Sequence, residues 1–152
     1  PEVLSALKIP GFSEYLHFWS EGRLFGLGRD ADEATGSADG IKLSMFDTSD
    51  PSDVREKCTL SLGQSYSEAL YNHRAILISA EKNFIGFPAD GSYMIYGYTD
   101  AEGFTKSAEI DCGESWSGAR GLYIDDFAYI IGDAITVLDM TDFTLITTIT
   151  IA

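Results

Sequence analysis

The chain has 152 residues, 45% of them hydrophobic, and carries 10 Lys and Arg against 24 Asp and Glu, for a formal net charge of −14. Its length is sufficient for one globular domain with a real core. Because nucleic acids are bound mainly by cationic side chains that displace counterions, this charge excludes a nucleic-acid-binding role. It contains no run of 18 apolar residues, so we expect no membrane-spanning helix.

Strand-like segments begin close to the N-terminus. Residues 4–9 resemble the last strand of a preceding unit, because Pro10 and Gly11 end them as turn residues end later strands. A first unit follows, in which apolar and polar residues alternate with the period of two that indicates strands. Its four predicted strands cover residues 14–19, 23–28, 41–47 and 57–62.

The second and third units repeat this pattern of four strands. Those of the second unit are predicted at 67–71 continuing through 75–79, 84–88, 93–99 and 104–110, and those of the third at 120–124, 127–131, 135–139 and 145–151. Short turns such as Asp90-Gly91 and Asp125-Asp126 separate consecutive strands, which favours antiparallel hairpins. No stretch of a dozen residues shows a helical period.

Repetition at roughly 40–50 residues, four strands to a unit, is typical of β-propeller blades. We therefore predict an all-β fold: a partial β-propeller over residues 1–152, with a blade-ending strand at 4–9 and blades at approximately 13–62, 65–112 and 118–151. A β-sandwich is the alternative, but its sheets would not need three similar copies in series.

Three blades leave two apolar faces open, since each blade of a propeller buries its faces against its neighbours. We therefore expect this chain to be part of a larger ring. Its expected partners are the missing blades of the parent protein, or a second copy that joins through the open faces.

Two Ser-Glu segments, Ser13-Glu14 with Tyr15 and Ser67-Glu68 with Ala69, carry a family resemblance. The chain resembles bacterial secreted or membrane-anchored proteins with a C-terminal β-propeller distantly related to WD40 repeats, and residues 43–51 fit the same strand-and-turn pattern. The resemblance implies an extracellular or cell-surface location and a larger parent ring. It implies no catalytic residues.

Glu14 and Glu68 occupy the same place in two consecutive units, and Arg120 takes roughly the matching place in the third. If these residues open the innermost strands, they form a ligand-binding polar ring at one mouth of the channel. The other interpretation is structural, with Ser and Glu tying blades together by hydrogen bonds to backbone amides.

A polar loop at residues 30–40 is the candidate metal site. Its side chains Asp30, Asp32, Glu33 and Asp39 offer the hard oxygen ligands that calcium prefers, although the spacing is not that of an EF-hand. A solvated acidic loop is the alternative. Calcium is the one cofactor that we consider.

His and Cys are too few, at two of each, for a zinc site. His17 and His73 are interpreted as turn or inter-blade residues, and Cys58 and Cys112 as buried thiols, with a disulfide between them as the alternative. The Gly113-x-Ser115 segment lacks the second Gly and the helix of a nucleophile elbow.

The aromatic residues include a set with two interpretations. Blade core is the default, and a surface that stacks on a sugar or a peptide is the alternative; the set is Trp19, Tyr66, Tyr71, Trp116 and Tyr123.

These patterns together predict a non-enzymatic extracellular binding or scaffold module that recognises a protein or glycan through loops at one end of the ring. The alternatives are a hydrolase that acts on a glycan or peptide at the channel mouth through Glu14 and Glu68, and a calcium-stabilised surface protein.

Overall fold

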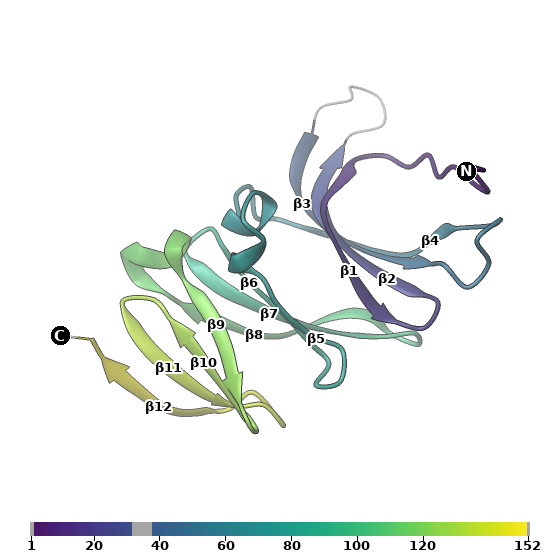
Figure 1. Cartoon of the computed structure of the whole chain (residues 1–152). Coiled ribbons are helices and arrows are strands. Elements are labelled where there is room, and N and C mark those ends of the chain that lie inside the picture. The colour runs from purple at the N-terminus through teal and green to yellow at the C-terminus, as the bar shows by residue number, and fades with distance from the viewer. Residues whose placement is uncertain (1, 32–37, 152) are drawn as a thin grey trace. The chain divides into compact units, whose positions relative to one another are not determined.

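The computed structural model describes residues 2–31 and 38–151, together forming three four-stranded antiparallel sheets and three short 3₁₀ helices (Figure 1). The chain divides into two compact units, the first ending at Ser65 and the second beginning at Tyr66. No helix in the described part of the chain is long and apolar enough to cross a membrane. The predicted all-β class is confirmed.

One sheet makes up the first unit, with its strands in the order of the chain. The strands are β1 (Phe12–Ser20), β2 (Arg23–Ala31), β3 (Ala38–Asp47) and β4 (Arg55–Leu62). Consecutive strands are joined as hairpins, because antiparallel neighbours need only short connections. The β1–β2 ladder shifts its register between Ser13 and Tyr15, so Glu14 lies at a bulge.

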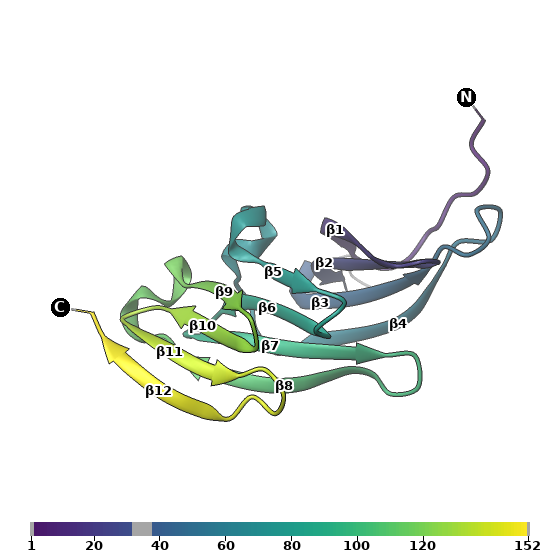
Figure 2. The same ribbon diagram turned by 60° about the horizontal axis from the view of Figure 1, so that its bottom comes forward.

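The second unit contains the other two sheets, and Figure 2 shows each as a run of consecutive strands. One consists of β5 (Leu77–Ser79), β6 (Phe84–Ala89), β7 (Ser92–Thr99) and β8 (Gly103–Asp111). The other consists of β9 (Arg120–Ile124), β10 (Phe127–Ile131), β11 (Ala134–Asp139) and β12 (Leu145–Thr150). The β6–β7 turn is the predicted Asp90-Gly91, with the positive φ angles of 39° and 101° that a tight hairpin needs.

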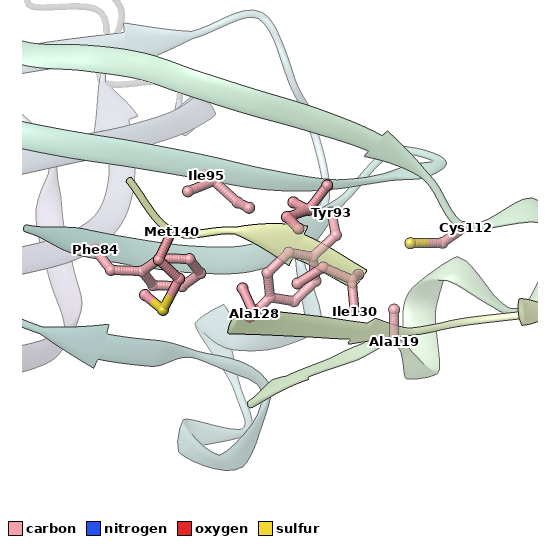
Figure 3. Close-up of a cluster of buried hydrophobic side chains, with 9 residues drawn as sticks. Phe84, Tyr93, Ile95, Cys112, Ala119, Ala128, Ile130 and Met140 are labelled. Carbon is pink, nitrogen blue, oxygen red and sulfur yellow. The ribbon is translucent and has the colours of Figure 1, made fainter. Parts of the chain in front are cut away.

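A hydrophobic core lies where these two sheets pack face to face. Phe84, Tyr93 and Ile95 come from β6 and β7, and Ala128 and Ile130 come from β10 (Figure 3). All five side chains are at most 1% exposed to solvent. Sheet packed on sheet through a shared apolar face is the arrangement of neighbouring propeller blades.

The 3₁₀ helices are in the segments that lead into β5 and β9. They are η1 (Glu68–Leu70), η2 (His73–Ala75) and η3 (Gly113–Gly118). Together with the β6–β7 and β10–β11 turns, these segments form one end of the second unit, since Tyr66 bonds to Asp90 and Glu114 to Asp133. We call this end the loop face.

Two of the predicted strands are wrong. Residues 67–71 form η1 and its cap, because the Ser67 side chain accepts a hydrogen bond from the Ala69 amide and so holds the backbone in a turn. Residues 4–9 form no strand either, since no described segment pairs with them and an unpaired segment has no ladder.

Candidate functional site

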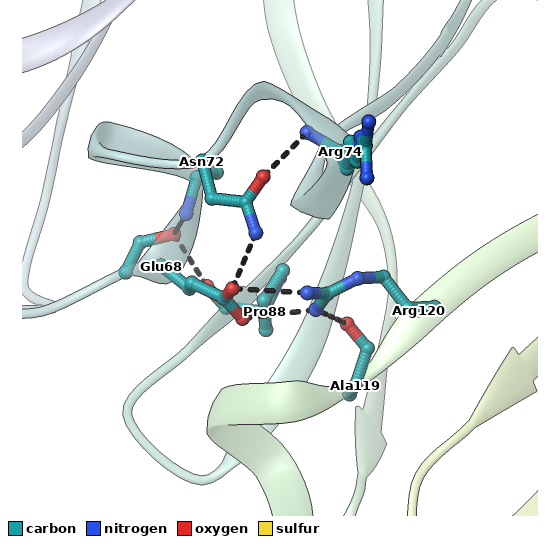
Figure 4. A network of polar contacts seen from close by, with 8 residues as sticks. Glu68, Asn72, Arg74, Pro88, Ala119 and Arg120 are labelled. Carbon is teal, nitrogen blue, oxygen red and sulfur yellow. Dashed lines mark hydrogen bonds and ion pairs between the residues drawn. The ribbon is translucent and has the colours of Figure 1, made fainter.

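An ion pair between Glu68 and Arg120 lies at the centre of the loop face. The Arg120 guanidinium donates from Nη1 and Nη2 to the two carboxylate oxygens of Glu68, each over 2.9 Å, and Nη1 also donates to the Ala119 carbonyl (Figure 4). Bidentate pairing of this kind is strong and directional. It joins the segment before β5 to the first residue of β9.

Two polar side chains hold Glu68 in place. Ser67 is fully buried and donates its hydroxyl to the Pro88 carbonyl over 2.6 Å, which attaches η1 to β6. Asn72 donates its side-chain amide to Glu68 over 2.6 Å, while its oxygen caps η2 by accepting from the Arg74 amide. The Glu68 carboxylate is therefore fixed from both sides (Figure 4).

The electrostatics keep Glu68 ionised. The hydrogen bond from Arg120 lowers the pKa of Glu68, assisted by that from Asn72, and outweighs the opposing effect of partial burial. A carboxyl group that serves as a general acid near neutral pH needs the opposite shift.

Three aromatic side chains gather on the same face: Tyr66, Tyr71 and Trp116. The ring centroid of Tyr66 lies 6.2 Å from that of Tyr71 and 5.8 Å from that of Trp116, the latter in an edge-to-face geometry. Trp116 is partly buried and packs against the hydrophobic core, whereas the side chains of Tyr66 and Tyr71 are 42% and 65% exposed to solvent. We call these three residues the aromatic surface.

Aspartate side chains order the loops that carry this surface. Asp90 accepts from the Tyr66 amide over 3.1 Å, and Asp133 accepts from the amides of Glu114 and Ser115, at the start of η3, over 2.9 and 3.2 Å. Hydrogen bonds from Ser115 and Glu114 lower the pKa of Asp133. The loops that carry the aromatic surface are therefore held in place by hydrogen bonds from backbone amides to aspartate carboxylates.

A buried hydroxyl lies just below the loop face. Tyr93 is fully buried, and its oxygen rests against the Gly121 backbone without making a hydrogen bond of acceptable geometry. Burial raises the pKa of this phenol. A side chain at Gly86 or Gly121 would collide with Tyr93, so both glycines provide room for its ring.

Comparison with known proteins identifies the fold family. A family model described as a β-propeller domain matches residues 1–143. The chain belongs to this β-propeller domain family. It is 36% identical over 140 residues, 91% of the chain, to an uncharacterized protein of Archaeoglobus fulgidus. It is also 28% identical over 130 residues, 85% of the chain, to an uncharacterized protein of Methanocaldococcus jannaschii.

The propeller domain spans about a fifth of the length of these two relatives, covering 20% of the first and 19% of the second. Both come from archaea, whereas the sequence resemblance pointed to bacterial proteins. The three sheets are therefore propeller blades within a family whose members include much longer chains.

The first unit of the propeller domain holds Glu14, which is exposed at the bulge of β1. Glu14 and Glu68 therefore differ in local structure, since one lies in a strand and the other in a 3₁₀ helix. The expectation that both open innermost strands is wrong for Glu68, because the Ser67 cap replaces the strand there.

An apolar groove of about 510 Å³ also belongs to the first unit, between residues 7–12 and the sheet. Leu7, Ile9, Leu16, Leu24 and Phe46 are among its lining residues. Beside it, the buried Lys42 donates to the Pro10 carbonyl over 2.8 Å and pairs with Glu56 at 3.3 Å. Lys42 thus fastens the N-terminal segment to β3.

The candidate calcium loop lies partly outside the described residues. Asp30 accepts from the Ser61 hydroxyl and from the amide of Ala31. Asp32, Glu33 and the side chain of Asp39 lie outside the described residues. Within residues 2–31 and 38–151, no three or more His, Cys, Asp or Glu side chains lie together as a metal site. Calcium binding by this loop stays a prediction.

The histidines and cysteines have separate surroundings. His17 shares a 2.9 Å hydrogen bond with the Tyr15 hydroxyl in β1, and His73 begins η2. Cys58 and Cys112 are both free thiols. Burial raises the pKa of Cys112 to about 11, so this thiol is largely protonated at neutral pH.

Sequence reasoning selected Glu68 and Arg120 but missed Asn72 and the two loop aspartates. Asn72 had a recognisable signal, since Asn is a favoured N-cap residue and His73 and Arg74 follow it. Asp90 and Asp133 both sit beside glycine in hairpin turns, a common position for aspartates that bond to backbone amides. Neither pattern reveals which distant loop is contacted.

Proposed function

We propose that this chain is a non-enzymatic binding module within a larger β-propeller protein and that it recognises its ligand through the loop face. The aromatic surface of Tyr66, Tyr71 and Trp116 is the observation that carries this proposal. Exposed aromatic side chains that are fixed in a polar surround are typical of recognition surfaces. Rigid blades that present such loops are suited to binding.

The state of Glu68 supports binding over catalysis. Both of its oxygens are occupied by Arg120 and one also by Asn72, and its pKa is lowered. A glycosidase mechanism needs one carboxyl group with a raised pKa and a second within about 5–10 Å. Glu68 does not meet the first requirement, and Arg120 and Asn72 already occupy the oxygens that it would need as the second carboxylate, so we assign it to positioning the loops.

Exposed apolar side chains on the edge strands β1 and β12 support the proposal that this chain is part of a larger ring. Leu16 and Phe18 on β1 are 53% and 69% exposed, and Leu145 and Ile146 on β12 are 62% and 52% exposed. We propose that further blades of the parent protein cover them, as blades bury their faces against neighbours. In isolation, these faces are expected to pair two copies of the chain.

Light scattering over a range of concentrations tests this assembly. A stable dimer that Phe18→Ser or Ile146→Ser weakens is the expected result. A monomer at all concentrations would contradict the open-face proposal.

The module is proposed to lie outside the cell or on its surface, as the resemblance in the sequence implies. Brief proteolysis of intact cells of the source organism, followed by peptide mass spectrometry, is the test. Loss of this domain's peptides is expected, whereas protection until the cells are lysed would overturn the location.

The binding role is tested with the labelled chain on two arrays, one of neutral and charged glycans and one of short peptides of varied charge. The variant Tyr66→Ala with Tyr71→Ala removes two of the exposed rings without changing net charge. Tyr123→Ala removes an exposed ring from the opposite end of β9 and is the matched control. Circular dichroism confirms that each variant is folded.

We expect that some glycans or peptides on the arrays bind the wild type and the Tyr123→Ala variant but do not bind the Tyr66→Ala, Tyr71→Ala double variant. If no feature binds, or if all bound features are insensitive to the double variant, the loop face is not a binding site and the proposal fails.

A further inference from the structure

We propose that the aromatic surface binds an arginine side chain of a basic segment in a protein partner. This inference rests on the proposed binding function and names the chemistry of its ligand. It follows from the ring geometry, the charge of the surrounding loops and the rigidity of the site.

The ring geometry suits a planar cation. A guanidinium that packs beside Tyr66 and Tyr71, whose centroids are 6.2 Å apart, can lie within the roughly 6 Å range of attraction to both rings. Trp116 lies edge-to-face with Tyr66 at an interplanar angle of 85° and also packs against the buried core, so it connects the aromatic surface to that core. Guanidinium stacks on aromatic faces better than ammonium does, because it is planar and more weakly hydrated.

The charge of the loops favours the same ligand. The segments of the loop face, taken with the adjoining strand ends Asp111 and Arg120, contain five acidic residues and only two basic ones, Arg74 and Arg120. Glu68 already neutralises Arg120. The remaining acidic residues of the loop face are Asp90, Asp111, Glu114 and Asp133. They add a local negative potential to the net charge of −14, which attracts a basic segment and repels an acidic one.

The aspartate side chains also order the loops. Asp90, Asp111 and Asp133 each accept a backbone amide hydrogen bond from a loop residue, and all three are exposed. The surface is therefore in place before the ligand arrives, which reduces the entropy lost on binding.

The opposite end of the same blades already contains one such contact. Lys82 Nζ lies 5.6 Å from the ring centroid of Tyr123 and 3.3 Å from a carboxylate oxygen of Asp126. There the Lys82 ammonium group lies over the exposed ring of Tyr123 and beside the carboxylate of Asp126. The aromatic surface likewise combines exposed tyrosine rings with nearby acidic side chains, but it has two tyrosines where this contact has one.

The experiment uses NMR titration of the ¹⁵N-labelled chain, which contains two tryptophans and so gives two indole N–H signals. Trp116→Phe assigns the Trp116 signal. Trp19 is 9% exposed in the first unit and serves as the internal reference. The probes are an octapeptide of alternating Arg and Ser, the same peptide with citrulline for Arg, and a neutral disaccharide, each in about 0.15 M salt.

We expect the arginine peptide to shift the Trp116 signal and not that of Trp19, and the citrulline peptide to bind at least about ten-fold more weakly, since citrulline lacks the charge. Tyr71→Ala should raise the dissociation constant about two- to five-fold, and Tyr71→Phe should restore it because the ring is retained. Tyr123→Ala should bind as the wild type does.

Equal binding of the arginine and citrulline peptides would overturn the inference. So would an arginine affinity that Tyr71→Ala leaves unchanged, because the attraction would then come from net charge alone. A shift with the disaccharide but not with the arginine peptide would overturn it too, while leaving the proposed binding function intact. Failure on both arrays, in contrast, removes the binding function itself.

Discussion

Arg120 and Glu68 are 52 residues apart in the chain, yet the guanidinium of one meets both carboxylate oxygens of the other at 2.9 Å. The pair connects the segment that precedes β5 with the start of β9, so it ties together the two blades of the second unit. It also fixes η1, which lies between Tyr66 and Tyr71 in the chain. Loss of the pair should therefore affect both stability and the loop face.

Replacing Glu68 with Gln should reduce the free energy of unfolding at pH 7 by about 1–2 kcal/mol, since a partly buried charged hydrogen bond is lost. The folded-state pKa of Glu68 is below its ordinary value of 4.5, so its contribution is complete above that pH. It disappears as the pH falls through the folded-state pKa. Urea unfolding of wild type and variant at pH 7 and at a series of pH values below 4.5 measures the difference.

Glu109→Gln is the matched control for this prediction. The pKa of Glu109 is also lowered, by Lys106, but that pair is 52% and 44% exposed. Solvent screens such a pair, so its removal should change stability by no more than about 0.5 kcal/mol. Equal effects of the two variants at pH 7, or a Glu68→Gln effect that does not decrease as the pH is lowered below 4.5, would contradict the assignment.

Gly121→Ala should destabilise the second unit by about 1–3 kcal/mol, because the added methyl group would overlap the Tyr93 hydroxyl and lie 2.8 Å from the ring carbon Cζ that carries it. Tyr93→Phe should be neutral or stabilising by up to about 1 kcal/mol, since it removes a buried oxygen without a partner. The double variant should recover part of the loss.

Thermal unfolding of the four proteins in this cycle measures these effects. Gly118→Ala is the control, because a methyl group there meets nothing within 4 Å. If Tyr93→Phe is as harmful as Gly121→Ala, the hydroxyl has a partner that matters and the assignment is wrong.

The two thiols should differ in reactivity. Cys112 is 4% exposed and its pKa is raised to about 11 from an ordinary 9.0, which lowers its thiolate fraction at pH 8 about a hundred-fold. Iodoacetamide should therefore modify Cys58 in the folded chain and Cys112 only after unfolding in urea. Peptide mass spectrometry locates the label. Native Cys58→Ser protein should stay unlabelled, and rapid labelling of Cys112 would show that its burial is not maintained.

If the loop at residues 30–40 binds calcium, the melting temperature should rise with millimolar calcium and fall with chelator. The variant Asp30→Ala with Asp32→Ala should lose this response. Asp50→Ala with Asp53→Ala changes the same charge in another turn and should keep it. A full calcium response in the Asp30 and Asp32 variant would remove the site from this loop.

The strands and their grouping into blades can be predicted from the amino-acid sequence alone. Alternation of apolar and polar residues, with turn residues at fixed intervals, is local information that a single segment carries. Segments such as 41–47 and 135–139 are therefore predicted almost at their observed bounds, as parts of Ala38–Asp47 and Ala134–Asp139. The segments at 4–9 and 67–71 were the exceptions: no described strand pairs with the first, and the Ser67 side chain offers the second a turn instead of a ladder.

The side chains that meet on the loop face are brought together by the three-dimensional fold. Of five aromatic residues that the sequence singled out, Tyr66, Tyr71 and Trp116 come together, because η1 and η3 are carried to the same end of two packed sheets. Arg120 reaches Glu68 for the same reason. Contacts of this kind depend on how sheets pack and on where loops close, and no period along the chain encodes either.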